Sequence, residues 1–254
     1  MKTRAVLLYK GVFGLENIRR ILSFVRRAVD DYDMIEEGDR IAVGVSGGKD
    51  SLTLLAALSD LKAFYPKKYE LFAVMIDMGF EGADFSDVEK FCRELGVELK
   101  IVHTNISHVI FDVRKEKNPC SLCARMRRGT LHDAVLELGC NKLALGHHYD
   151  DVLETFMLNL FHEGRLGTFS PVTYLDRKKL TMIRPMIYAP EKDIRYFSTK
   201  SKLPVTKSPC PADGATKRED MKQFLKKLEL ENHRGLKHRI FKAICKAELD
   251  GFKL

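Results

Sequence analysis

Apolar and polar residues alternate along this chain in two different patterns. Short runs of consecutive apolar residues predict strands that are buried on both faces, whereas apolar residues spaced three or four apart predict amphipathic helices. The predicted strands are residues 41–45, 70–77, 97–103 and 141–145, and the predicted helices are 15–32, 52–58, 86–95, 121–138 and 150–161. Because strands and helices alternate, the expected fold is α/β, a doubly wound parallel sheet with helices on both faces.

The pattern changes after residue 170. Two short apolar segments, 172–175 and 180–183, are joined by a charged turn and predict a β-hairpin. Basic helices are then expected over 191–200, 217–230 and 236–249, packed against the rest of the chain. No run approaches 18 consecutive apolar residues, and residues 1–10 lack the features of a signal peptide. We therefore expect a cytoplasmic protein with no membrane partner.

A polar, glycine-bearing turn, Ser46-Gly47-Gly48-Lys49-Asp50-Ser51, joins the first predicted strand to the next helix. Two adjacent glycines allow close approach of a ligand to the backbone, and the amides and dipole of a helix N-terminus favour phosphate. The Asp50 carboxylate would repel a nucleotide's phosphates unless Mg2+ lay between them. The turn therefore predicts a site for a magnesium-bound nucleotide, with Lys49 offsetting phosphate charge. The alternative is a turn that only connects strand and helix.

Positive charge is unevenly distributed along the chain. The net charge is +8, and residues 171–254 carry 20 Lys and Arg against 10 Asp and Glu, so this part alone contributes +10. A second basic cluster includes Arg125, Arg127 and Arg128. Such clusters are typical of proteins that bind nucleic acid, and these three arginines are the candidate RNA contacts. A solvated basic surface is the alternative interpretation.

Six cysteines in a chain expected to be cytoplasmic favour metal or redox chemistry over disulfides. Cys120 and Cys123 form a Cys-x-x-Cys pair at the start of a predicted helix, and Cys210 stands between two prolines. Three interpretations remain open from the residues alone: an iron–sulfur cluster, zinc with a ligand other than cysteine, and a redox dithiol. The other cysteines, Cys92, Cys140 and Cys245, have apolar neighbours and are interpreted as core or inert thiols.

Several motifs together resemble a known family. The Ser46–Ser51 turn resembles that of the PP-loop ATP pyrophosphatases. The segments 120–129 and 144–151, with Arg184-Pro185 and Pro209-Cys210, are similar to the tRNA 2-thiocytidine synthetase branch of that superfamily. The resemblance implies that ATP adenylates a pyrimidine of tRNA, a cytidine in the anticodon loop, and that sulfur then replaces its oxygen. It also implies a 4Fe-4S cluster with three cysteine ligands.

The resemblance assigns roles to individual residues. The predicted ATP-binding residues are Ser46, Gly47, Gly48, Lys49, Asp50, Ser51, Asp77, Gly146 and His147; the predicted catalytic residues are Lys49, Asp50 and Asp150; and the predicted cluster ligands are Cys120, Cys123 and Cys210. Asp150 or Asp151 would otherwise cap a helix, with Asp151 the stronger candidate for that structural role. Asp77 would otherwise be a turn residue.

The same resemblance suggests an organisation and a set of partners. Residues 1–35 would form an N-terminal helix region, 36–190 the PP-loop nucleotide-binding domain with the Cys-x-x-Cys pair, and 191–254 a basic helical region carrying the third cysteine. Expected partners are tRNA and a sulfide or persulfide donor of the cysteine desulfurase type, with a homodimer as a candidate assembly. Two rivals remain: a PP-loop enzyme acting on another tRNA uridine or a small acceptor, and a non-catalytic ATP-binding iron–sulfur sensor or sulfur carrier.

Overall fold

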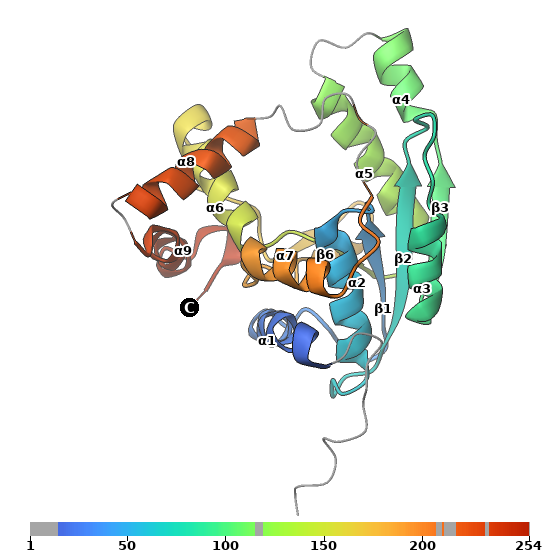
Figure 1. Ribbon diagram of the computed structural model, residues 1–254, viewed down its shortest axis with the longest axis horizontal. Coiled ribbons are helices and arrows are strands. Elements are labelled where there is room, and N and C mark those ends of the chain that lie inside the picture. Colours follow the sequence, from blue (N-terminus) through green and yellow to red (C-terminus); the bar gives the residue numbers. More distant parts are fainter. Residues whose placement is uncertain (1–14, 115–118, 207–209, 211–216, 232–233, 254) are drawn as a thin grey trace, which may run out of the picture.

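The computed structural model describes residues 15–114, 119–206, 210, 217–231 and 234–253. Its centre is a six-stranded sheet with the strand order β3-β2-β1-β4-β6-β5 (Figure 1). The strands are β1 (Asp39–Val45), β2 (Tyr69–Asp77), β3 (Glu98–His103), β4 (Lys142–Ala144), β5 (Val172–Leu175) and β6 (Leu180–Ile183).

Helices connect and cover these strands. They are α1 (Leu15–Asp31), α2 (Lys49–Lys62), α3 (Ser86–Glu94), α4 (Ile106–His108), α5 (Pro119–Glu137), α6 (Tyr149–Leu158), α7 (Glu191–Lys200), α8 (Lys217–Glu231) and α9 (Leu236–Lys246). Short π-helical segments, Val109–Val113 and Asn159–Glu163, follow α4 and α6, and a 3-10 turn spans Leu249–Gly251. Within the part of the chain described, none of these helices combines the length and the apolar character that a membrane crossing requires.

The pairing of the strands confirms the predicted α/β class. β1 pairs in parallel with both β2 and β4, β2 with β3, and β4 with β6. The predicted hairpin is also confirmed, because β5 pairs antiparallel with β6 and forms one edge of the sheet. The carboxyl ends of β1, β2, β4 and β6 consequently lie at the same edge, where doubly wound proteins bind their ligands.

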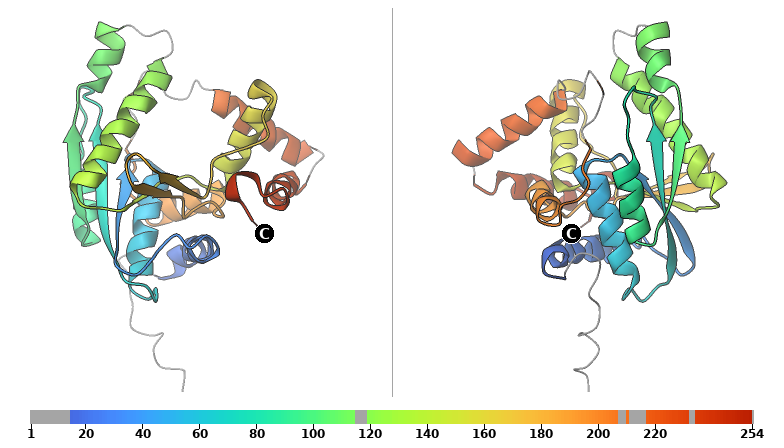
Figure 2. Two further views of the ribbon diagram at one scale, coloured as in Figure 1. Left: turned by 180° about the vertical axis from the view of Figure 1, so that it is seen from behind. Right: turned by 45° about the vertical axis from the view of Figure 1, so that its right-hand side comes forward.

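Side chains of the central strand alternate between two apolar cores. Ile41 and Val43 of β1 belong to the larger core, which also contains the buried face of α2, whereas Ala42 packs with Ala134 and Val135 of α5. Accordingly, α2 and α3 lie on one face of the sheet and α5 on the other (Figure 2). Burial on both faces explains why the strands are almost continuously apolar in sequence.

The last two helices pack against α6 and not directly on the sheet (Figure 1). Their buried residues, including Leu225 and Phe241, belong to the larger core. The ring of Phe241 lies 4.7 Å from that of Tyr149 at the start of α6 and 6.0 Å from that of Tyr188, measured between ring centres. This aromatic contact connects the basic C-terminal helices to the elements that end at the ligand-binding edge.

Candidate functional site

The turn Ser46–Ser51 lies between the end of β1 and the start of α2. Gly48 precedes the first residue of α2, and no side chain caps the helix there. Ser51 holds the turn closed, because its Oγ accepts the Ser46 N–H at 3.1 Å and donates to the Gly48 carbonyl at 3.0 Å. The first amides of α2 are thus left without a side-chain acceptor, and together with the positive end of the helix dipole they favour an anion.

Two glycines at this edge are required for close packing. Gly47 has a φ of 76°, and a Cβ placed on it would lie 2.2 Å from the Oγ1 of Thr206. A Cβ on Gly146 would lie 3.2 Å from the Asp50 carbonyl carbon. The Thr206 N–H also donates to the Gly47 carbonyl at 3.0 Å. The turn is therefore enclosed by the segment that leads towards Cys210 and by the end of β4.

Charged groups from two helices meet at the turn. The Lys49 Nζ lies 3.0 Å from the Asp50 Oδ2 and 3.2 Å from the Glu191 Oε1. Burial lowers the pKa of Lys49, but the two carboxylates outweigh burial and the pKa is raised overall. Burial likewise opposes ionisation of Glu191, yet hydrogen bonds from Lys222 and Lys49 and their charges bring its pKa to about 2. Both groups are therefore charged at neutral pH.

The second carboxylate oxygen of Asp50 has the environment expected of a metal ligand. Its Oδ1 is buried and has no hydrogen-bond partner among the described residues. The Nε2 of His148 is 3.7 Å away, beyond hydrogen-bond distance. A buried carboxylate oxygen without a partner is costly, and Mg2+ prefers carboxylate oxygens together with phosphates. The donor atoms present at this turn therefore fit a magnesium-bound nucleotide.

The beginning of α6 differs from its prediction. The capping residue is His148, not an aspartate: its Nδ1 accepts the Asp151 N–H at 3.4 Å, and the Asp151 Oδ2 accepts the His148 N–H at 2.9 Å. Asp151 thus contributes from the third position of the helix. Asp150 is buried, and its two oxygens accept the Glu191 N–H at 2.8 Å and the Lys237 Nζ at 2.6 Å. Asp150 joins α6, α7 and α9, and its catalytic role stays a prediction.

Asp77 lies at the end of β2, at the same edge as the phosphate turn. One oxygen accepts the Gly79 N–H at 2.8 Å, and the other lies 2.9 Å from the Nδ1 of the exposed His103. These contacts are sufficient to stabilise the turn that follows the strand. The predicted contact of Asp77 with the nucleotide stays a prediction.

His147 follows β4 and packs on an aromatic ring. The centre of its ring lies 4.8 Å from that of Phe169, and its buried Nδ1 has no hydrogen-bond partner among the described residues. Burial is the main cause that lowers the pKa of His147, to about 4, so the imidazole is neutral at pH 7. Arg184 follows β6, and the carbon of its guanidinium lies 5.2 Å from the centre of the same Phe169 ring. Polar groups from two neighbouring strands therefore meet at Phe169.

The three cysteines predicted to act together are brought near one another. Cys120 and Cys123 lie in the first turns of α5, Cys120 exposed and Cys123 half-buried, and Cys210 is also half-buried. Burial raises the pKa of Cys123, the charge of Arg127 lowers it, and Cys210 and Cys120 raise it further. The thiol of Cys210 therefore acts electrostatically on that of Cys123, although 87 positions separate them in the sequence.

Thiols are the ligands that iron–sulfur clusters use, so the chemistry of this donor set is compatible with such a cluster. Among the described residues no three such side chains surround a position where one metal ion could bind. The remaining cysteines are buried as predicted, and burial raises the pKa of Cys92 and Cys140 to about 11.

The arginines predicted to contact RNA are exposed on α5. They are Arg125, Arg127 and Arg128. The charge of Arg127 lowers the pKa of Cys123, and that of Arg128 lowers the pKa of Arg184. The arginines of α1 behave differently, since Arg20 lies 3.2 Å from the carboxylate of Asp193. Within the described part of the chain, Arg125, Arg127 and Arg128 form no ion pair with a carboxylate, and their contact with RNA stays a prediction.

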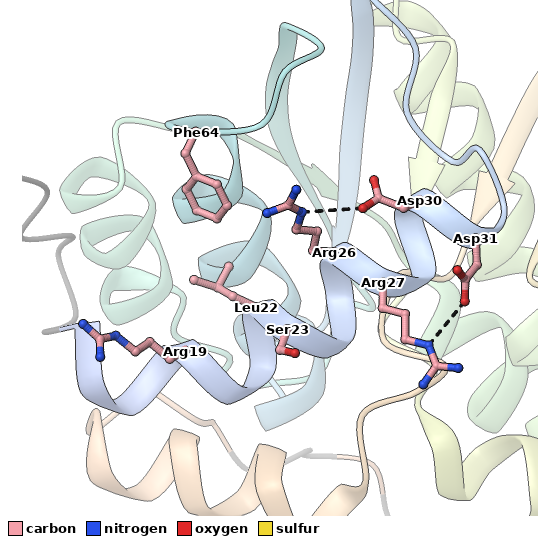
Figure 3. Close-up of a pocket in the computed structure, with 8 residues that line it drawn as sticks. All are labelled: Arg19, Leu22, Ser23, Arg26, Arg27, Asp30, Asp31 and Phe64. Carbon is pink, nitrogen blue, oxygen red and sulfur yellow. Dashed lines mark hydrogen bonds and ion pairs between the residues drawn. The ribbon is translucent and has the colours of Figure 1, made fainter. Parts of the chain in front are cut away.

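A separate cavity of about 580 Å3 lies along α1 (Figure 3). In it, Arg26 and Arg27 form ion pairs with Asp30 and Asp31 one turn later, at 3.5 and 3.4 Å. None of the predicted site residues lines this cavity. Its lining residues are Arg19, Leu22, Ser23, Arg26, Arg27, Asp30, Asp31 and Phe64.

Reasoning from the sequence missed the residues that support the site from a distance. Thr206, Glu191 and Lys237 contact the turn or Asp150 from segments far away in sequence. Only Glu191 carries a local signal, because it is an acidic residue directly after a proline at the start of a helix.

The fold and this edge together define a class: an α/β nucleotide-binding protein with a phosphate turn and several cysteine thiols. A family model described as a PP-loop domain matches residues 16–229. The chain therefore belongs to the PP-loop family.

Individual relatives of this chain are named as tRNA-modifying enzymes. The tRNA-cytidine(32) 2-sulfurtransferase of Geotalea uraniireducens is 43% identical over 232 residues, which cover 90% of this chain and 92% of the relative. That of Pelobacter propionicus is 44% identical, covering 84% and 80%. The solved structure of the U34-tRNA thiolase NcsA from Methanococcus maripaludis with its [4Fe-4S] cluster is 29% identical, with a TM-score of 0.74 and coverage of 91% and 79%. The resemblance to tRNA thiolases of the PP-loop superfamily is confirmed.

Proposed function

We propose that this protein is an ATP-dependent tRNA sulfurtransferase that converts a cytidine of tRNA to 2-thiocytidine. The base oxygen O2 would attack the α-phosphorus of ATP, and pyrophosphate would leave. Sulfide would then attack C2, and AMP would leave with the former base oxygen. ATP, tRNA and sulfide are thereby converted to AMP, pyrophosphate and thiolated tRNA, with no change in the oxidation state of the base.

The phosphate turn performs the first half of this reaction. The amides of α2 and the Lys49 ammonium are positioned to stabilise negative charge on the phosphates as pyrophosphate leaves. Asp50 would hold Mg2+ through its unpartnered Oδ1, and Glu191 keeps Lys49 charged and oriented. Asp150 and His147 are proposed to line the reacting edge, with Asp150 acting through the positions of α7 and α9.

The cysteines perform the second half. Cys120, Cys123 and Cys210 would hold a 4Fe-4S cluster, whose chemistry when bound is the delivery of sulfur to the activated base. The observation that supports the proposal is that Thr206, four residues before Cys210, is hydrogen-bonded to Gly47 of the phosphate turn, and that Cys120 and Cys210 both influence Cys123 electrostatically. Activation of the base and supply of sulfur can therefore occur at one place.

Cytidine is favoured over uridine as the target. Relatives at 43% and 44% identity are named for cytidine 32, whereas the thiolase named for uridine 34 is 29% identical. We extend the proposal to position 32 of the anticodon loop, where an unpaired base can be turned out for reaction. A sulfide or persulfide donor of the cysteine desulfurase type, a cytoplasmic location and a homodimer complete the proposal.

The proposal is tested by product analysis with protein purified without oxygen. The protein is incubated with tRNA, Mg-ATP and sulfide, and the nucleosides are then analysed by mass spectrometry alongside AMP and pyrophosphate. We expect 2-thiocytidine, AMP and pyrophosphate in equal amounts, and iron in the purified protein. Omission of ATP should abolish the thiolated product.

Each rival gives a different result. Thiouridine in place of thiocytidine would assign the protein to another tRNA target. ATP binding without pyrophosphate release would indicate a non-catalytic sensor or sulfur carrier. Pyrophosphate release by iron-free protein with a small acceptor would favour an enzyme of that type. Any of these outcomes would overturn the proposed function.

A further inference from the structure

Arg184 is a buried cation that has no anionic partner among the described residues. Its side chain follows β6 and is only 7% exposed. Its Nη1 donates to the Ser170 carbonyl at 2.5 Å and to the Thr173 Oγ1 at 3.0 Å. No carboxylate lies within 4.0 Å of the guanidinium among the described residues. A buried arginine is normally paired with a carboxylate or another anion, so this arrangement calls for a ligand.

The unused donors lie on one edge of the guanidinium. The Nε is buried and has no hydrogen-bond partner, and no described residue accepts a bond from Nη2. The Nε–Nη2 edge presents two parallel donors whose spacing matches two oxygens of a phosphate. The guanidinium carbon lies 5.2 Å from the centre of the Phe169 ring, a cation–π contact that restrains the side chain.

The surroundings of this edge are also suited to a phosphodiester. The His147 ring also packs against the Phe169 ring. Its Nδ1 has no partner among the described residues, and the neutral imidazole can form a hydrogen bond with the ligand. Arg128 of α5 is exposed and near enough to lower the pKa of Arg184 further, after the larger effect of burial. Two arginines that act on each other electrostatically, with no carboxylate paired to Arg184 among the described residues, would be stabilised by an anion between them.

The position distinguishes this ligand from the phosphates of ATP. The phosphate turn follows β1, and β4 lies between β1 and β6 in the sheet. Two strand spacings, roughly 10 Å, therefore separate Arg184 from the strand that carries the turn. We propose that Arg184, assisted by Arg128, binds a backbone phosphate of the tRNA next to the nucleotide being modified. This inference rests on the proposed function.

The test compares tRNA binding by the complete protein and by three variants, without ATP and over a range of salt concentrations. Arg184→Met keeps much of the side-chain volume but removes the donors, Arg128→Met removes the exposed partner, and Arg177→Met in the β5–β6 turn is the matched control. Loss of one phosphate contact should weaken binding about tenfold at 0.1 M salt and reduce the slope of log K against log salt by about 0.7–0.9. Arg177→Met should match the wild type.

The outcomes separate this inference from the proposed function. Unchanged tRNA affinity and slope in Arg184→Met, with thiolation intact in the wild type, would overturn the inference alone. An increased KM for ATP with unchanged tRNA affinity would also overturn it, and would assign Arg184 to the nucleotide. No tRNA binding by the wild type would contradict the proposed function itself. If Arg184→Met does not fold, the exposed Arg128→Met variant decides, because the inference requires it to reduce the slope as well.

Discussion

The phosphate turn and the thiol group lie at one edge of the sheet but are built in opposite ways. The turn is continuous in sequence, and its Ser51 hydroxyl bonds to both Ser46 and Gly48 within six residues. The thiols come from the start of α5 and from position 210, and two of the three are only half-buried. The turn is therefore formed by its own residues, whereas the thiol group needs the whole fold and, by our proposal, a cluster to hold it together.

This difference has a functional meaning. A nucleotide must bind and leave in every cycle, so a turn that its own hydrogen bonds hold closed reduces the cost of ordering. A cluster is a lasting component and can supply binding energy to the segments that ligate it, as structural metals do. Thr206, which lies four positions before Cys210, connects the two regions. Its N–H donates a hydrogen bond to the Gly47 carbonyl.

The largest expected effect comes from removing one thiol. Cys210→Ala should abolish both iron binding and thiolation while ATP binding is retained, because the two sites are built from different segments. Cys245→Ala is the matched control, because Cys245 is buried in α9. This variant protein should keep its iron and its activity. Iron analysis measures the cluster content of both variants, and titration with nucleotide measures their ATP binding. Full thiolation by Cys210→Ala would contradict the three-cysteine cluster.

The next effect concerns the metal bridge at the turn. Asp50→Asn preserves the size of the side chain but removes the charge of the unpartnered oxygen, so pyrophosphate release should fall by about 100- to 1,000-fold. Iron content should not change. A normal rate at saturating Mg2+ would show that Asp50 is not the metal ligand.

A smaller effect is expected from adding one methyl group to the turn. Gly47→Ala forces a Cβ against Thr206 and should slow pyrophosphate release by about 100-fold, the cost of a misplaced catalytic group. Gly82→Ala is a matched control, since Gly82 has a similar φ of 73° but nothing within 4 Å of the added Cβ. Both changes strain the backbone by about 1–2 kcal/mol. Equal activities in the two variants would refute a specific role for the Thr206 contact.

The smallest effect is on stability and its pH dependence. The folded pKa of Glu191, about 2, is below its ordinary value of 4.5, so its contribution is complete above about pH 4.5 and is lost as the pH falls towards 2. Glu191→Gln should therefore lower the free energy of unfolding by about 1–2 kcal/mol at pH 7, and the difference should shrink below pH 4.5. The exposed Glu89→Gln should have little effect. A pH-independent difference would exclude ionisation of Glu191 as the cause.

The sequence was sufficient for the parts of the molecule that depend on neighbouring residues. The alternating α/β pattern, the hairpin at 172–183 and the Ser46–Ser51 turn could all be predicted, because each follows from local periodicity or turn chemistry. The roles of Cys120, Cys123 and Cys210 could not be chosen from spacing alone. Only the resemblance to a family distinguished a cluster from zinc or a redox pair.

Residues that act across the fold were the ones missed. Lys237 bonds to Asp150 from 87 positions away, and Thr206 bonds to Gly47 from 159 positions away, so neither leaves a local signal. An aspartate was considered as the alternative cap of α6 because Asp is a preferred capping residue; Asp151 does take part in the capping box, but His148 occupies the N-cap position. Its imidazole can accept the same hydrogen bond once the end of β4 places it there.

The most direct test of the account follows the oxygen that leaves the base. A tRNA transcribed with cytidine carrying 18O at O2 is thiolated by anaerobically purified protein, and the AMP product is analysed by mass spectrometry. Adenylation of the base followed by attack of sulfide predicts one 18O atom in AMP for each 2-thiocytidine formed. Thiolated tRNA accompanied by unlabelled AMP would contradict activation at the phosphate turn, and with it the claim that the turn and the thiols act on one nucleotide.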